Sequence, residues 1–120
     1  MHAARLTMTM NFKASRDVII RTDNFDEATK FYEQVLGLAI AYKSETLYGF
    51  DAGSFRLYVE RGSSRHGPVF DFLVTDFQVA KQALLAAGCR IDEEDLSVPR
   101  CYIRDPHGLV FNIEQRAAEK

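Results

Sequence analysis

Seven side chains that could do chemistry recur at alternate positions of short extended stretches. They carry carboxylate, guanidinium, phenol or amide groups: Asp17, Arg21, Arg56, Tyr58, Asp71, Asn112 and Glu114. Alternate residues of a strand share one face, and the residues between these are mostly apolar, so we expect the polar set on one face of a sheet. Such a mixture suits a pocket for a small polar or anionic organic molecule, because guanidinium groups bind carboxylates and phosphates in a fork. The alternative is that the charges pair across neighbouring strands and bind nothing.

The elements that would position these residues are indicated by hydrophobic periodicity and turn residues. Residues 17–21 predict a strand, Thr22 to Asn24 offer capping side chains, and residues 25–36 predict a helix ended by Gly37. Three further strands are expected near 38–43, 46–51 and 55–60, and the polar segment 61–68 is typical of a linker.

The same order of patterns then restarts. A strand at 69–74 precedes the capping pair Thr75 and Asp76, a helix at 77–87 and a stop at Gly88, and further strands are expected at 90–92, 100–104 and 109–114. The acidic stretch 92–95 is interpreted as a solvated loop. Landmarks of the first half return about 51 to 54 residues later, as Gly37 and Gly88 do, which indicates a duplicated βαβββ module.

Length and composition favour one small domain of ordinary globular type. The chain has 120 residues, of which 47% are hydrophobic and 27% charged, with a net charge of −2. We expect a domain at 15–116 with modules at about 16–61 and 68–115, an N-terminal extension at 1–14 and a tail at 117–120. Without a basic stripe, a membrane-span pattern or a leader-like apolar run, the sequence predicts a cytoplasmic protein that binds neither nucleic acid nor membrane.

Cysteine and histidine offer little chemistry here. Cys89 and Cys101 are expected to be small buried or half-buried thiols, although a disulfide between them stays possible. His66 falls in the linker and His107 in a turn, so both are expected in solvent. No phosphate loop, dinucleotide fingerprint, nucleophile elbow or CxxC pair is present.

Two stretches carry a family resemblance. Residues 31–38 (FYEQVLGL) and the turn 105–108 (DPHG) that leads into the last strand resemble the vicinal oxygen chelate superfamily, which includes glyoxalases, bleomycin-resistance proteins and extradiol dioxygenases. The resemblance implies an α+β fold in which two βαβββ modules form a curved, half-open, barrel-like cleft. It also implies a homodimer for a chain of this length.

The resemblance further implies where metal ligands would stand, at positions that hold Asp17, Tyr58, Val69 and Asn112 in this sequence. Only one of these is a carboxylate, so we expect a metal-free protein that binds a small molecule in the cleft, with catalysis left open. One alternative is a metal-dependent lyase, isomerase or dioxygenase that holds Zn, Ni, Mn or Fe with a displaced set (Asp17, Glu60 and Glu114). A second alternative is a non-catalytic dimeric interaction module.

Overall fold

The computed structural model describes residues 12–63 and 67–116. The chain divides into two compact units, an N-terminal unit of residues Arg16–Asp71 and a C-terminal unit of Phe72–Lys120 together with Met1–Ser15. Most of the expected N-terminal extension, His66 and the tail at 117–120 lie outside the described residues.

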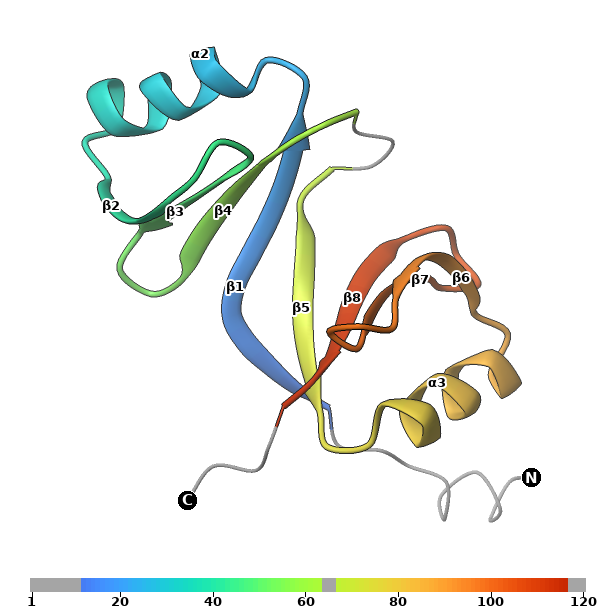
Figure 1. Cartoon of the computed structure of the whole chain (residues 1–120). Helices are drawn as coiled ribbons and strands as arrows, with labels where there is room; N and C mark the ends of the chain where they lie inside the picture. The colour runs from blue at the N-terminus through green and yellow to red at the C-terminus, as the bar shows by residue number, and fades with distance from the viewer. Residues whose placement is uncertain (1–11, 64–66, 117–120) are drawn as a thin grey trace. The chain divides into compact units, whose positions relative to one another are not determined.

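The N-terminal unit has one helical segment and four strands (Figure 1). In chain order these are β1 (Lys13–Thr22), α2 (Phe25–Lys30), the π-helical turn η1 (Phe31–Val35), β2 (Ala39–Lys43), β3 (Leu47–Asp51) and β4 (Arg56–Arg61). The strand order is β2-β3-β4-β1, in which β4 runs parallel to β1 and the other pairs are antiparallel.

The C-terminal unit repeats this plan. It contains the second half of β5 (Val69–Val74), and all of α3 (Phe77–Ala86), β6 (Arg90–Asp95), β7 (Arg100–Arg104) and β8 (Val110–Gln115), in the strand order β6-β7-β8-β5. The edge strands even share an irregularity, since the register shifts between Ile40 and Tyr42 in β2 and between Ile91 and Glu93 in β6. A bulge at the same place in both units confirms the duplicated βαβββ module and the mixed α+β class.

The ends of the helices follow the expected chemistry at three of four places. Gly37 (φ 70°) and Gly88 (φ 101°) adopt the left-handed conformation that ends a helix, and Asp76 accepts a hydrogen bond from the Val79 amide. The fourth prediction is wrong: Asn24 is the N-cap of α2 but makes no side-chain cap bond, and Thr22 Oγ1 accepts from the Asn24 amide.

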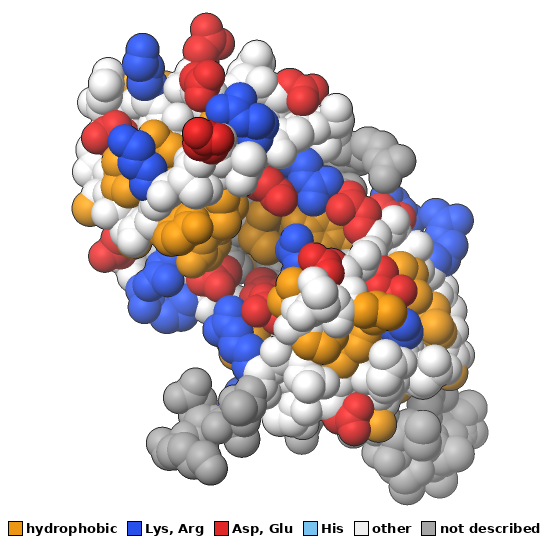
Figure 2. All heavy atoms as spheres, viewed as in Figure 1, with side chains coloured by type: hydrophobic (Ala, Val, Ile, Leu, Met, Phe, Trp, Pro, Cys, Tyr) orange, Lys and Arg blue, Asp and Glu red, His pale blue; other side chains and the backbone are white. Residues whose placement is uncertain are grey.

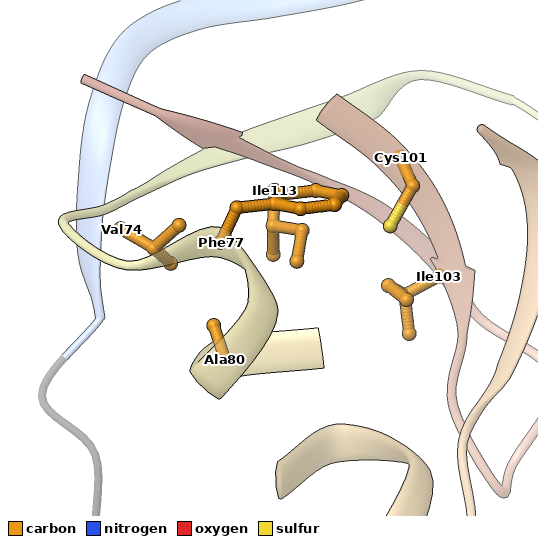
Figure 3. Close-up of a cluster of buried hydrophobic side chains, with 6 residues drawn as sticks. All are labelled: Val74, Phe77, Ala80, Cys101, Ile103 and Ile113. Atoms are coloured by element: carbon orange, nitrogen blue, oxygen red, sulfur yellow. The ribbon is translucent and has the colours of Figure 1, made fainter. Parts of the chain in front are cut away.

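Each unit buries its own hydrophobic core on the helix-facing side of its strands. In the N-terminal unit this core is built around Phe25, Phe50, Leu57 and Val59. Figure 3 shows the other core, in which Phe77 and Ala80 of α3 meet side chains of three strands: Val74, Cys101, Ile103 and Ile113. Alternation along the strands predicts Phe55 and Phe70 in these cores, but their side chains are 39% and 61% exposed.

The acidic stretch 92–95 is part of a strand, which corrects the expected loop. β6 pairs with β7 along its whole length, from Arg90 opposite Arg104 to Asp95 opposite Arg100. Two of its carboxylates form ion pairs there: Asp92 binds Arg104 and Glu94 binds Lys81. Paired charges on an edge strand also discourage further strand addition.

Candidate functional site

The face of β1 and β4 that points away from α2 carries polar side chains in register; we call it the inner face of the N-terminal unit. The parallel pairing sets Asp17 beside Arg56, Ile19 beside Tyr58, and Arg21 beside Glu60. The alternate residues point the other way, toward the core. The structure therefore brings together five of the polar residues singled out in the sequence, Glu60 included.

Arg56 and Tyr58 form the most defined donor pair on this face. Arg56 Nη1 donates to the Tyr58 hydroxyl at 3.3 Å. This hydrogen bond, with smaller contributions from the Asp17 and Asp51 carboxylates, raises the pKa of the exposed Arg56 guanidinium. Arginine has five N–H donors in a fixed fork, so one bond to Tyr58 orients the group and still leaves an edge suited to an anion.

The Tyr58 ring rests on a glycine of the next strand. Gly49 lies opposite Tyr58 in the β3–β4 ladder and has no side chain of its own. A Cβ placed there would meet Tyr58 Cε1 at 2.8 Å and Tyr42 Cβ at 3.4 Å. The missing side chain therefore makes the space that one edge of the ring, Cδ1 and Cε1, occupies.

A half-buried ion pair closes one end of the inner face. Arg21 Nε lies 3.2 Å from Glu60 Oε1, and the two side chains are 17% and 29% exposed. The stem of Arg21 runs over Gly62, where an added Cβ would stand 3.2 Å from Arg21 Cδ. Glu60 is thus held by a cation, which disfavours its use as a metal ligand.

The C-terminal unit has an inner face of the same kind with a different aromatic residue. Tyr102 lies opposite Asn112 and Arg100 lies opposite Glu114 in the β7–β8 ladder. Three of these residues, Arg100, Tyr102 and Asn112, border a hollow of ≈ 240 Å³, whose lining also includes Glu93, Glu94, Asp95 and Cys101. Sequence reasoning missed Tyr102, although the alternation of residues 100–104 (RCYIR) would have placed it opposite the core residues Cys101 and Ile103.

The two inner faces differ in which strand carries the tyrosine. In the N-terminal unit the ring comes from β4 (Tyr58) and the small partner from β3 (Gly49). In the C-terminal unit the ring comes from β7 (Tyr102), and the equivalent of Tyr58 is Asn112 on β8. Each inner face therefore carries one tyrosine in its β-ladder, but Tyr102 is 3% and Asn112 0% exposed, so these two side chains are buried rather than open to a ligand. Tyr58, in contrast, is half-buried and can offer an apolar contact.

Three further positions have a different surrounding. Asp71 and Val69 are each 2% exposed in β5, so both are buried rather than open to a ligand from solvent. His107 is exposed in the turn after β7, as expected for a turn residue.

On the surface in view in Figure 2, acidic and basic side chains are intermixed with apolar area between them.

The donors at the implied ligand positions do not fit a transition-metal site. Val69 has no lone pair, the Tyr58 phenol is engaged with Arg56, and Asn112 offers only a neutral amide. In residues 12–63 and 67–116, no three histidine, cysteine or acidic side chains gather as a metal site would require. The displaced set is divided between the units, because Asp17 and Glu60 belong to the N-terminal unit and Glu114 to the C-terminal unit. Glu114 also forms an ion pair of its own, since its Oε2 lies 3.5 Å from Arg116 Nε.

Comparison with known proteins identifies the family. A family model described as Glyoxalase-like domain matches residues 17–114, and the chain belongs to this family within the vicinal oxygen chelate superfamily. No protein of curated function matches the sequence.

Solved structures share the fold at low sequence identity. A glyoxalase/bleomycin resistance protein/dioxygenase superfamily member from Vibrio splendidus is 14% identical, with a TM-score of 0.61 over 88% of this chain and 100% of that one. A hypothetical protein from Bacillus halodurans is 10% identical, with a TM-score of 0.67 and coverage of 92% and 99%. Homoprotocatechuate 2,3-dioxygenase from Arthrobacter globiformis is 16% identical, with a TM-score of 0.67 over 89% of this chain but only 37% of the dioxygenase.

No helix within the described ranges is long and apolar enough to span a membrane.

Proposed function

We propose that the protein binds a small polar or anionic organic molecule on the inner face of its N-terminal unit, without a metal ion. The observation that carries the proposal is the Arg56–Tyr58 pair, held at 3.3 Å beside Asp17 and supported by Gly49. A guanidinium and an aromatic ring in fixed positions supply an anion contact and an apolar contact a few ångströms apart.

The metal-free part of the proposal is supported by the donor set. The family's ligand positions hold one carboxylate, Asp17, and the nearest substitute, Glu60, is paired with Arg21. Recruiting Glu60 to a metal would leave the 17% exposed Arg21 cation without its carboxylate, which is costly for a half-buried pair. We therefore assign the inner face to binding through hydrogen bonds and stacking.

The first experiment screens small aliphatic and aromatic carboxylates and phosphate monoesters by differential scanning fluorimetry, followed by calorimetry of any compound that raises Tm. We expect Arg56→Ala to weaken binding at least about tenfold, which corresponds to about 1.4 kcal/mol. Arg16→Ala is the matched control, because Arg16 is an exposed arginine of β1 whose guanidinium donates to the Gly53 carbonyl. Equal binding by the wild type and Arg56→Ala would contradict the proposed site.

The second experiment tests the metal-free state. Elemental analysis of protein purified without chelators is expected to give well below one equivalent of Zn, Ni, Mn or Fe per chain. A stoichiometric metal that is lost in Glu60→Gln would overturn this part of the proposal and favour the lyase or dioxygenase alternative.

A further inference from the structure

A second hollow lies on the other side of the N-terminal sheet. It has a volume of ≈ 850 Å³ and is lined by residues of α2, of the β2–β3 hairpin and of the end of β4: Phe25, Asp26, Lys43, Ser44, Glu45, Thr46, Tyr48 and Arg61. Tyr48 lies opposite Val59 in the β3–β4 ladder, whereas Gly49 lies opposite Tyr58. Because neighbouring residues of a strand point to opposite faces, this hairpin hollow is separate from the inner face.

Arg61 is fixed in one position within the hairpin hollow. Its guanidinium carbon lies 4.4 Å from the centre of the Phe25 ring, which is a cation–π contact. Arg61 Nε donates to the Glu45 carbonyl at 3.1 Å, and Nη2 lies 3.1 Å from Asp26 Oδ1. Three contacts hold the guanidinium over the ring, yet the side chain remains 44% exposed and accessible to a ligand.

Lys43 supplies a second cation over a second ring. Its ammonium lies 5.7 Å from the centre of the Tyr48 ring, and this ring packs edge-on against Phe25 at a centroid distance of 5.5 Å. The hollow thus has two cations above two packed aromatic rings. The methylene stems of Lys43 and Arg61 and the carbon face of Tyr48 provide apolar walls between the charges.

The lining holds two cations, Lys43 and Arg61, and two carboxylates, Asp26 and Glu45, so a preference for an anion depends on where the cations lie and not on net charge. Asp26 is 82% exposed and already bound to Arg61, so the pair contributes little net field. Glu45 reaches Arg61 through its backbone carbonyl, on the exposed tip of the hairpin. The Lys43 ammonium lies over an aromatic ring and has three N–H donors. A ring face is a weaker hydrogen-bond acceptor than an oxygen atom, so these donors suit an anionic oxygen of a ligand.

We propose that the hairpin hollow is a second binding site, which takes a small organic anion with a flat apolar body, such as an aromatic carboxylate. The carboxylate lies against Lys43 and the exposed edge of Arg61, and the flat body lies on the Tyr48 ring and the two methylene stems. Ser44 keeps the hairpin in shape, because its hydroxyl accepts from the amides of Thr46 and Leu47.

The test uses the full chain, benzoate as the probe and amide chemical shifts as the readout. We expect benzoate to produce saturable shifts at residues 43–48 and 61. Lys43→Met keeps the stem and removes the charge, and it should weaken this binding at least about fivefold. Lys30→Met, which removes an exposed lysine of α2 outside the hollow, should leave it unchanged.

Three outcomes would overturn the proposal. One is the absence of saturable shifts at residues 43–48, and another is binding that survives Lys43→Met. The third is equal perturbation of these amides by benzylamine, since a cation of the same shape should not occupy the site. If benzoate binding is lost in Arg56→Ala but kept in Lys43→Met, the inner-face proposal stands and the hairpin-hollow proposal fails.

Discussion

The ring of Tyr58 lies on Gly49 of the neighbouring strand, so closely that a methyl group at position 49 would stand 2.8 Å from Tyr58 Cε1. This contact fixes where the Tyr58 hydroxyl meets Arg56, and it ties the proposed ligand contacts of β4 to the absence of a side chain in β3. The glycine is needed for space rather than for a special backbone angle, since Gly49 is not among the glycines with positive φ.

Gly49→Ala is therefore expected to displace the Tyr58 ring and to destabilise the protein by about 1–3 kcal/mol, the usual cost of overpacking. The same substitution should lower the affinity for any ligand whose binding depends on Arg56. Urea unfolding and calorimetry measure the two effects. In Gly49→Ala/Tyr58→Ser the clash is gone, so the stability loss should be smaller than the sum of the two single losses.

Gly67→Ala is the matched control, because an added Cβ there meets nothing within 4 Å and its φ is not in the left-handed region. It should leave stability within about 0.5 kcal/mol of the wild type. Additive losses in Gly49→Ala and Tyr58→Ser would show that the ring does not depend on the glycine.

The order of elements was predictable because both halves repeat the same local signals. Gly37 and Gly88 end helices in the left-handed conformation, and β5 and β7 were placed at their observed bounds. The alternation of polar and apolar residues in β4 also assigned Leu57 and Val59 to the core. These features depend on local backbone preferences and on side-chain alternation, both of which a single sequence carries.

The missed features depend on which strand lies beside which. Residues 92–95 look like a solvated loop until β7 supplies Arg104 and α3 supplies Lys81 as partners. Alternation along β7 could have assigned Tyr102 to a face, but its partner Asn112 follows only from the β7–β8 pairing, as the contact of Gly49 with Tyr58 follows only from the β3–β4 pairing. The hairpin hollow arises because Arg61, at the end of β4, folds onto Phe25 of α2. Such contacts join residues far apart in the chain and leave no periodic signal.

Ile103 is expected to be among the costliest residues to truncate in the C-terminal unit. Its side chain is 0% exposed and packs among Phe77, Ala80 and Ile113. Ile103→Ala removes methylene groups from a packed core, which typically costs about 2–5 kcal/mol. Leu109→Ala serves as the control because Leu109 is 69% exposed, and it should change stability by less than about 0.5 kcal/mol. Equal midpoints of urea unfolding for the two variants would contradict the assigned core.

The two cysteines should differ in reactivity. Burial raises the pKa of the Cys101 thiol to about 11, so about one molecule in a thousand carries the thiolate at pH 8. Burial also raises the pKa of Cys89, but this thiol is only half-buried. With Ellman's reagent at pH 8, we expect one slow thiol in the folded protein and two after unfolding. In Cys89→Ala the folded protein should show none; a fast reaction there would place Cys101 at the surface.

The Asp105 carboxylate is expected to stabilise the turn between β7 and β8 in a pH-dependent way. It accepts hydrogen bonds from the amides of Leu109 at 3.0 Å and His107 at 2.8 Å, and these bonds, that of Leu109 first, lower the pKa of Asp105. The pKa of Asp105 is therefore lower in the folded state than in the unfolded state, where it is near 3.8. The ionised carboxylate then stabilises the folded state above pH 3.8, and this stabilisation is lost as the pH falls through the pKa of the folded state. Asp105→Ala should therefore lower the urea midpoint at pH 7, and the difference from the wild type should shrink toward pH 2. Asp105→Asn keeps an oxygen acceptor that cannot ionise, so its difference from Asp105→Ala should not change over this range. A wild-type advantage over Asp105→Ala that persists undiminished in acid would show that the amide bonds do not depend on the charge.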